Sequence, residues 1–561
     1  MTVLGDRPPV GVALPPQAGL PSRAARTRNT PRARRATRAA RRRASLPPTH
    51  PRGLWWVAPI GTILMVVPLS LYVSIANTQV DFRLFFRSPK LMTGHYALLF
   101  LMAAVFLAIG TALPQALRPS RWRPAWPGFD EAQLRIMDKA MNVTFWLTAF
   151  GYAAFLAAGV ARGARPSTLA NALTNNFTGQ VKTMFAPVTG ITTFTQMGIA
   201  FTILAGLRLA ITGRNGRVLR RLGVVFLLAL VRSFFLTERL AILELAVPLL
   251  AISAVRMRHR SRYRSLVPFM PILFIPVLLV VFGLFEYSRS WVFFRTRTSL
   301  SYPDFVVHRL AGYYATAYNN GAISLISGKP KGVMPFGSLQ ALWTTPGLSQ
   351  LHLFQLLSHG FNPGTYGDAL YQLGNPEFNN PCGLAQPLFD FGIPGGMVFF
   401  VVAGIVVGFT YRGFRNNNPY GVLIYPLLFT GLMELPRYLY WTQGRVVPSV
   451  VALAITARLM TRASHPRRVF GAWLRSATPT PARALAGGVP AATLAAVAAD
   501  PTAVGAFAAA GRAGREGTGP PGPPGAGPGG PPDPGDDPGG SGSTADPGTA
   551  GPPGGALPAA P

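Results

Sequence analysis

The feature that most constrains this chain is a series of apolar runs, each long enough to cross a membrane. A helix needs roughly 20 apolar residues to span the hydrocarbon core of a bilayer. With 49% hydrophobic and only 13% charged residues, the chain is also too apolar for an ordinary soluble enzyme. The sequence therefore predicts an all-α polytopic membrane protein. The runs lie at 54–75, 95–117, 141–161, 190–211, 223–255, 265–285, 391–411, 420–435 and 446–460.

The run at 223–255 is longer than one span requires. It can form one over-long helix, or two short helices hinged at Thr237, Glu238 and Arg239. Basic loops favour the cytoplasmic side, and only with two helices does the Arg-rich segment 256–264 fall on the same side as the basic N-terminal arm. We therefore predict two helices here, about ten transmembrane helices in all, and both termini in the cytoplasm. The other basic connections then fall on that side too: 118–139, 212–221 and 412–418.

Both ends of the chain differ in composition from the transmembrane domain at 51–465. The Arg- and Pro-rich arm at 1–50 and the Ala-, Gly- and Pro-rich tail at 476–561 are predicted to be disordered cytoplasmic segments. The net charge of +34 is concentrated in the tails and in short loops, so membrane topology explains it better than nucleic-acid binding. Attraction of the arm to anionic lipid head groups is the alternative.

No motif in the sequence indicates a metal or a cofactor. Cys382 is the single cysteine, so the chain has no internal disulfide and no Cys-rich metal site. A P-loop, a GxGxxG after a strand and an HExxH are all missing. ATP-driven transport and zinc proteolysis are therefore poorly supported, and we predict no metal and no cofactor.

A long polar insertion at 286–390 separates two of the apolar runs, and the topology places it outside the cell membrane as a large, partly helical extracytoplasmic loop. It is rich in aromatic residues, Asn and Gly, as in HRLAGYYATAYNNGA. Guanidinium and amide groups hydrogen-bond phosphate and hydroxyl oxygens, and aromatic faces stack on sugar rings. The insertion therefore predicts a site for sugars and phosphates. Its candidate residues are Arg289, Arg295, Arg309, Tyr313, Tyr314 and Asn319.

Charged residues at the edges of spans are costly to place in lipid, so they are expected to face the protein interior or a polar cavity. One group is Arg232, Glu238 and Arg239, at the predicted hairpin. For Arg232 and Arg239 the alternatives are an ion pair with Glu238 or Glu244, or a side chain that reaches the head groups.

A second charged group lies between the last two spans, in MELPRYLYWTQGR. It contains Glu434, Arg437 and Arg445. The alternative for the two arginines is an interfacial anchor, because the neighbouring residues also suit an aromatic belt. These neighbours are Tyr438, Tyr440 and Trp441.

Three residues are candidates for a general base: His308, Glu238 and Glu434. An unperturbed imidazole titrates near neutral pH, and a carboxylate can also accept a proton. Asp390 either serves as a base or caps the helix that follows it. The remaining loop groups that can serve as a base are His352, His359, Asp368 and Glu377.

These features together resemble the Wzy-type O-antigen or oligosaccharide repeat unit polymerases. The resemblance covers 54–460 and rests on about ten spans, a large outer loop late in the chain, the Arg and Glu pair in LVRSFFLTERLAILELAVP, and PLFDFGIPGG directly before a span. It implies a metal-independent glycosyltransferase of the cytoplasmic membrane, which transfers a growing glycan from undecaprenyl pyrophosphate to another lipid-linked repeat unit at the outer face. The product is a surface or exported polysaccharide.

Arginines suit this chemistry because they can bind the pyrophosphate and neutralise the charge that develops as it leaves. We assign catalysis to Arg239, Glu238, Arg437, Glu434 and His308. We assign substrate binding to Arg232, Arg289, Arg295, Arg309, Tyr313, Tyr314, Asn319 and Arg445.

Other functions remain open at this point. An O-antigen ligase hands the glycan to a different acceptor, and a flippase for lipid-linked sugar also needs cationic groups in a polar cavity. The long outer loop and the lack of repeated halves argue against a transporter. A non-catalytic membrane scaffold is the third class. The expected partners are the lipid-linked oligosaccharide, membrane lipids, a chain-length regulator and a flippase, with no nucleic acid.

Overall fold

The computed structural model describes most of the predicted transmembrane domain. The chain divides into two units, Met1–Ala472 and Trp473–Pro561, and of the second unit only 473–477 is described. The predictions for the arm at 1–50 and for nearly all of the tail at 476–561 fall outside the described residues. These residues are 53–117, 129–165, 167, 181, 183–188, 190–236, 240–259, 263–362 and 368–477.

Every regular element of these residues is a helix, as predicted for an all-α chain. The first half contains α2 (Pro59–Ala76), α3 (Gln79–Leu84), α4 (Gly94–Leu117), α5 (Glu131–Ala161), η1 (Thr192–Gln196), α8 (Met197–Thr212), α9 (Gly216–Leu236), α10 (Leu240–His259), η3 (Val267–Phe269) and α11 (Met270–Glu286). The second contains η4 (Tyr287–Trp291), α12 (Val292–Phe294), α13 (Tyr302–Ser327), α14 (Gln340–Thr344), η5 (Ser349–Leu351), α15 (Leu353–Leu357), α16 (Asp368–Leu373), η7 (Pro376–Phe378), α17 (Ala385–Arg415), α18 (Pro419–Glu434), η8 (Tyr440–Thr442), η9 (Gly444–Val446) and α19 (Val447–Ala477).

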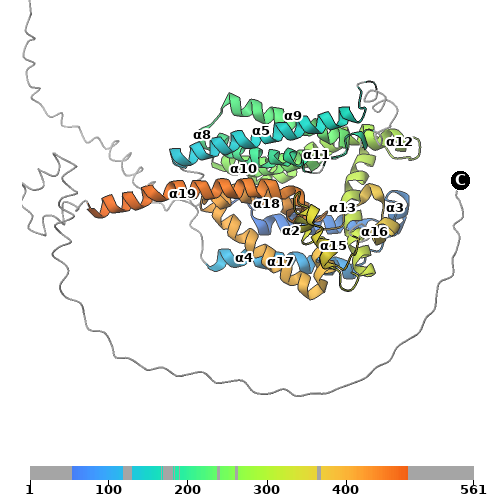
Figure 1. The fold of residues 1–561 in the computed structure, drawn as a ribbon. Coiled ribbons are helices and arrows are strands. Elements are labelled where there is room, and N and C mark those ends of the chain that lie inside the picture. The colour runs from blue at the N-terminus through green and yellow to red at the C-terminus, as the bar shows by residue number, and fades with distance from the viewer. Residues whose placement is uncertain are drawn as a thin grey trace, which may run out of the picture. The chain divides into compact units, whose positions relative to one another are not determined.

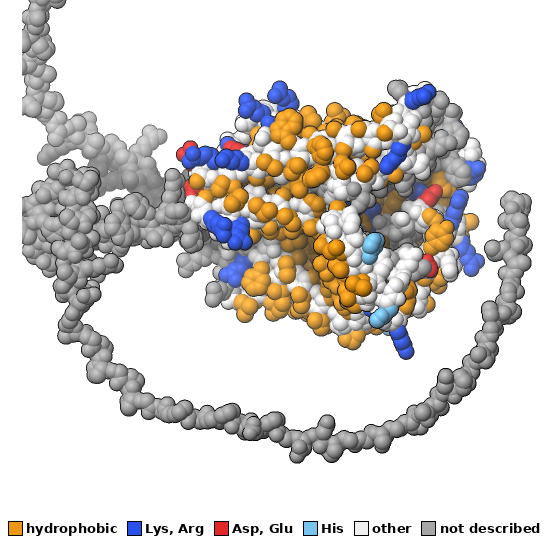
Figure 2. Space-filling model, in the orientation of Figure 1, with side chains coloured by type: hydrophobic (Ala, Val, Ile, Leu, Met, Phe, Trp, Pro, Cys, Tyr) orange, Lys and Arg blue, Asp and Glu red, His pale blue; other side chains and the backbone are white. Residues whose placement is uncertain are grey.

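Eight of the described helices are long and apolar enough to cross a membrane. Hydrophobic side chains cover the middle of the face in Figure 2, and Lys and Arg side chains gather mainly toward its two ends. This distribution is that of a multi-pass membrane protein. The predicted pair of helices at 223–255 is present as α9 and α10, which pack against each other. Because α9 is rich in arginine and α18 has only 16 residues, neither is among the eight, and the count of ten stays a prediction.

Among the described residues, α4 and α17 share the most extensive helix–helix contact, and they run side by side in Figure 1. A Cβ atom added to Gly404 would lie 2.3 Å from the carbonyl oxygen of Leu107, and one added to Gly110 would lie 2.3 Å from that of Val401. Gly408, four residues after Gly404, makes a similar contact with Thr111. Such small-xxx-small spacing lets the backbones of two membrane helices touch, which supplies packing that lipid does not.

The insertion is built around α13, which crosses the long helices steeply at one end of the bundle (Figure 1). Ser301 caps the first turn of α13. The helix ends at Ser327, and the residue that follows, Gly328, has a φ of 68°. Tyr318 is fully buried and its hydroxyl lies 3.0 Å from Ser70 Oγ on α2. Ser74 Oγ donates to the carbonyl of Ala315 on the same side of α13. The insertion therefore has a packed helix at its base, and its position outside the membrane stays a prediction.

The rest of the insertion is fastened to this crossing helix and to α17. Asn320 donates to the carbonyls of Phe378 and Asn380, and Asp390 accepts from the backbone N–H groups of Phe336 and Ser338. Asp390 therefore holds the loop at 336–338, and these two bonds do not cap the helix that follows it. Gly392, at φ 71°, breaks α17 two residues later, so the apolar part of α17 starts where PLFDFGIPGG predicted a span.

We expect Gly404→Leu to destabilise the protein, because no side chain fits where the α4 backbone touches α17. Overpacking of this kind costs about 1–3 kcal/mol, which should lower the thermal unfolding midpoint in detergent and the yield of monodisperse protein. Val402→Leu on the same helix is the matched control, since Val402 is 56% exposed. Equal midpoints for the two variants would contradict the contact.

Candidate functional site

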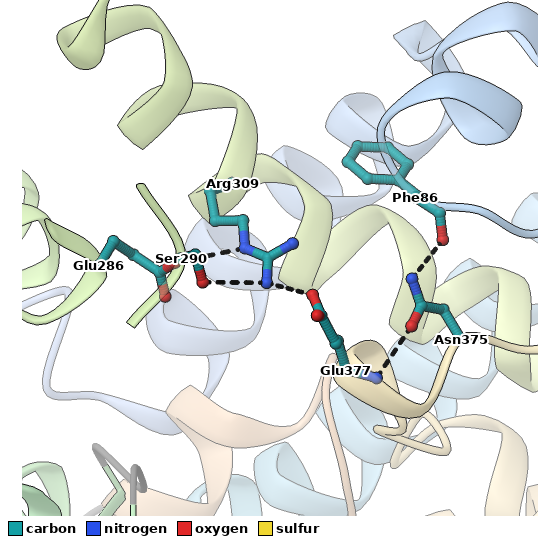
Figure 3. A network of polar contacts seen from close by, with 6 residues as sticks. All are labelled: Phe86, Glu286, Ser290, Arg309, Asn375 and Glu377. Carbon is teal, nitrogen blue, oxygen red and sulfur yellow. Dashed lines mark hydrogen bonds and ion pairs between the residues drawn. The ribbon is translucent and has the colours of Figure 1, made fainter. Parts of the chain in front are cut away.

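The first cluster, here called the Arg309 cluster, forms where α11, α13 and η7 meet (Figure 3). Arg309 donates from Nε to Glu286 Oε2 (3.3 Å) and from Nη2 to Ser290 Oγ (3.3 Å). It also donates to the carboxylate of Glu377. The Phe378 ring lies 4.5 Å from the guanidinium carbon. Arg309 is therefore fixed by two carboxylates, one hydroxyl and the rings of Phe378 and Phe294, and only 5% of its side chain is exposed.

A pocket of about 290 Å³ opens beside this cluster. Arg87, Arg297, Arg309 and His308 supply its polar wall, and the described residues that line it include no Asp or Glu. The His308 ring stacks on Phe85 at 5.1 Å. Arg87 has a left-handed φ of 50°, a strained conformation of the kind found at binding sites. A cationic pocket walled by aromatic rings suits an anionic group joined to a sugar. The other lining residues are Leu84, Phe85, Phe86, Phe294, Thr298, Ser299, Leu300, Phe305 and Phe378.

The second cluster, here called the Arg437 cluster, begins in the connection between α18 and α19. Arg437 Nη1 donates to Glu434 Oε2 at 2.8 Å. The guanidinium lies 5.7 Å from the ring of Tyr313 and 5.6 Å from that of Tyr438. Tyr314 is close enough to Glu434 and Arg437 to feel both charges, and burial raises the pKa of its hydroxyl. The Glu434–Arg437 pair is thus held among three tyrosine rings.

The same cluster continues through Glu244 on α10. Arg445 Nε lies 3.5 Å from Glu244 Oε1. Gln196 bridges Glu244 and Arg232 when its amide is oriented so that nitrogen donates to Glu244 Oε2 (3.2 Å) and oxygen accepts from Arg232 Nη1 (3.0 Å). Arg232 also donates to Thr195 Oγ1 at 3.1 Å. Helix ends from α8, α9, α10 and α19 therefore meet at one buried polar centre.

Two aromatic rings join the clusters. The ring of Phe378, which contacts Arg309, lies 5.0 Å from that of Tyr313 in an edge-to-face contact. Tyr313 in turn contacts Arg437, and Tyr438 contacts both Arg437 and Arg445 (5.9 Å). Cation–π contacts of this kind hold arginine without neutralising it. The result is one continuous series of guanidinium groups and rings at a single end of the bundle.

The electrostatics of the Arg437 cluster favour a permanent positive charge. Burial lowers the pKa of Arg437, but Glu434 first and then Tyr438 raise it, and the balance lies above the usual value. Burial also raises the pKa of Tyr438. The Arg437 Nε and the Tyr438 hydroxyl are buried without a hydrogen-bond partner among the described residues. These groups are therefore able to donate to a ligand oxygen.

The turn that carries Arg437 is fixed by several hydrogen bonds. The Arg437 carbonyl accepts from the Cys382 N–H (2.9 Å), and the Leu439 N–H donates to Gln386 Oε1 (3.0 Å). Trp441 Nε1 donates to Leu428 O, and Thr442 Oγ1 donates to Gly337 O. A site whose backbone is fixed in this way holds its side chains in place before a ligand binds.

The structure brings together most of the predicted site residues. Arg232, Arg437, Glu434 and Arg445 share the Arg437 cluster with Tyr313 and Tyr314, while Arg309 and His308 line the pocket. Tyr438, predicted only as an alternative belt residue, lies between two arginines.

Other predicted residues lie elsewhere. Arg239 and Glu238 fall outside the described residues, as does the side chain of Arg289. Arg295 is exposed and does not line the pocket. Asn319 is fully buried: its Oδ1 accepts from the N–H groups of Leu91 and Met92, and its Nδ2 donates to Pro89 O. Because its amide is engaged by the backbone, we assign Asn319 a structural role and leave it out of the site.

The sequence analysis missed Gln196 and Phe378. It named Glu244 and Glu377 only as alternatives. Glu377 was weighed as a base but binds Arg309. Glu244 was weighed as a partner of Arg232 but lies against Arg445 and Gln196. The available signal was the presence of Gln196 and Glu244 inside apolar runs, where polar groups are expensive and therefore functional or paired. Phe378 had no such signal.

No protein-family model, no curated protein and no solved structure matches this chain. The function is therefore inferred from the geometry of the two clusters.

Arg309→Met should destabilise the protein by about 3–5 kcal/mol, because it removes the Arg309 cation from the fully buried Glu286 carboxylate. Adding Glu286→Leu should restore most of the thermal midpoint. Adding Glu377→Gln should not, since Glu377 is 48% exposed and water can solvate it. Equal rescue by the two second changes, measured by thermal unfolding in detergent, would show that Glu286 is not the critical partner.

Proposed function

We propose that this chain is a glycosyltransferase of the cytoplasmic membrane that polymerises undecaprenyl-pyrophosphate-linked oligosaccharide repeat units into a surface or exported polysaccharide. Both termini lie in the cytoplasm and the two clusters lie at the outer face. The observation that carries the proposal is the pair of arginine clusters joined by Phe378 and Tyr313.

A polymerase must hold two lipid-linked pyrophosphates at once, one on the donor and one on the acceptor. The Arg309 pocket presents three arginines with no acidic group in its described lining. The Arg437 cluster contains three arginines and two glutamates, so it keeps a net positive charge. Each can bind one polyanion, and the rings between them suit the sugars that must meet there.

In the proposed reaction, an acceptor hydroxyl attacks the anomeric carbon of the donor sugar as the bond from that carbon to the pyrophosphate oxygen breaks. The pyrophosphate leaves with the bonding electrons, and guanidinium groups stabilise its charge. The hydroxyl proton passes to a base. Among the described residues His308 and Glu434 remain the candidates, and His308 is the better placed because it faces the pocket whereas Glu434 holds Arg437.

The alternatives use the same groups differently. A ligase needs one pyrophosphate site and a second acceptor of another kind, and a flippase needs one site that opens to both faces in turn. Two fixed cationic sites at one end of the bundle favour the polymerase over both.

Deleting the gene should collapse a polysaccharide ladder to single repeat units, measured on the lipid-linked glycans of the null strain. Polymer stranded on its carrier would instead indicate a ligase, and repeat units accumulating on the inner face would indicate a flippase. Complementation with the unaltered gene should restore the ladder.

Arg437→Met with Glu434→Gln should abolish polymerisation while the protein still folds. The double change removes both charges of the pair, so no unpaired carboxylate remains buried. If Arg437 only stabilised the structure, this variant would make a normal ladder. Arg214→Met is the matched control and should leave chain length unchanged, because Arg214 is exposed and lies just before the start of α9, at the end opposite Arg232.

His308→Gln should lower turnover by about 100-fold or more, the contribution expected of a general base, and change KM for the donor little. Single-turnover assays with purified enzyme and lipid-linked repeat units measure this. His95→Gln, at an exposed position, is the control. Full turnover in His308→Gln would show that His308 is not the general base.

A further inference from the structure

Helix α11 contacts the rest of the protein at its two ends. Just before its start, in η3, the carbonyls of Val267 and Pro268 accept from the indole N–H groups of Trp56 and Trp55, each at 3.0 Å. At its end, Tyr302 on α13 donates to the carbonyl of Gly283. Glu286, the last residue of α11, is fully buried against Arg309.

Between these anchors the helix stands away from the bundle. Phe282, Gly283 and Glu286 are buried and define the inward face. With 3.6 residues per turn, that face continues through Leu279, Ile275 and Ile272. Leu279 is only partly buried, Ile275 is 50% exposed and Ile272 is 62% exposed. Every position from 272 to 278 is exposed, so the inward face is as open as the outward one.

The local sequence explains why the middle of α11 does not pack against the bundle. Pro276 lies inside α11, and a proline in a helix removes one backbone hydrogen bond and bends it. A π-helical turn, η4, follows directly after Glu286, and such turns are frequent at functional sites. The helix can therefore keep Glu286 on Arg309 while its middle diverges from the bundle.

The exposed inward face of α11 runs toward the Arg309 pocket. This face is apolar along 272–279 and ends at Glu286, which is bonded to Arg309, a residue that lines the pocket. The pocket beyond adds Arg87 and Arg297 and has no acidic group in its described lining. A molecule that fits both parts has a long apolar chain and an anionic head. The phenylalanine rings of the pocket wall favour a sugar beside that head group.

We propose that the space behind α11 is the lateral entry and binding groove for the polyprenyl chain of the substrate, whose phosphate is held in the Arg309 pocket. The proposal rests on the proposed function, since it assumes a lipid-linked glycan. It assigns the donor or acceptor carrier lipid to one side of the protein and to named residues, Ile272 and Ile275.

Binding of undecaprenyl phosphate to the full-length protein in detergent tests the groove directly. Ile272→Trp and Ile275→Trp place bulk in the groove and should weaken binding about tenfold. Val277→Trp is the matched control, because Val277 is equally exposed (51%) but lies on the opposite face of the helix. It should bind like the unaltered protein. Equal affinities for all three variants, with unchanged thermal midpoints, would overturn the proposal.

A cross-linking measurement does not depend on weakened binding. A photo-reactive phenylalanine analogue at position 272 should label undecaprenyl phosphate, and one at Leu284, on the outer face, should not. Equal labelling of phosphatidylglycerol vesicles at position 272 would identify an ordinary lipid contact and overturn the proposal. Cross-linked dimers of the chain would overturn it in favour of a second copy.

These outcomes separate the groove from the proposed function. Specific labelling by undecaprenyl phosphate together with a null strain that still makes long chains would keep the groove and reject the polymerase. A null strain with single repeat units but without specific labelling at position 272 would keep the polymerase and reject the groove.

Discussion

A guanidinium group in a low-dielectric interior has to be paired, and this requirement organises one whole end of the protein. Arg309 is fixed by Glu286 from α11 and by Glu377 from the insertion, 23 and 68 residues away in sequence. Arg445 meets Glu244 from α10 in the same manner. Removing one member of such a pair costs several kcal/mol, so each pair fixes where its helices can end.

The pairing of Arg437 is incomplete, and a guanidinium group that is only partly paired can still bind an anion. Arg437 gives one guanidinium nitrogen to Glu434 and keeps Nε buried without a partner among the described residues. Tyr313 and Tyr438 hold the rest of the group by ring contacts that leave its charge intact. A fixed cation that keeps one unpartnered N–H group needs no reorganisation when it binds a polyanion. This preorganisation is the condition for strong electrostatic catalysis.

The sequence was enough to locate the helices and most of the arginines, for one reason. Arg232 and Glu434 interrupt or border apolar runs, where their cost in lipid marks them. The partners were harder to find, because pairing depends on packing between distant elements. Phe378 looks like any loop aromatic until η7 lies on α13, and Asn319 looked like a sugar ligand although the backbone of 89–92 engages its amide. A local pattern cannot distinguish these roles.

The proposed groove behind α11 connects access from the membrane to the chemistry of the pocket. The helix that leaves an opening along Ile272 and Ile275 also carries Glu286, whose carboxylate helps to orient Arg309. Since the last turn of α11 is packed and its middle is not, α11 can adjust to an apolar chain with Glu286 still anchored. A rigid helix packed along its whole length would fix Glu286 equally well but would close the route from the bilayer. Pro276 and the π-helical turn η4 therefore allow α11 both to hold Glu286 against Arg309 and to leave its middle unpacked.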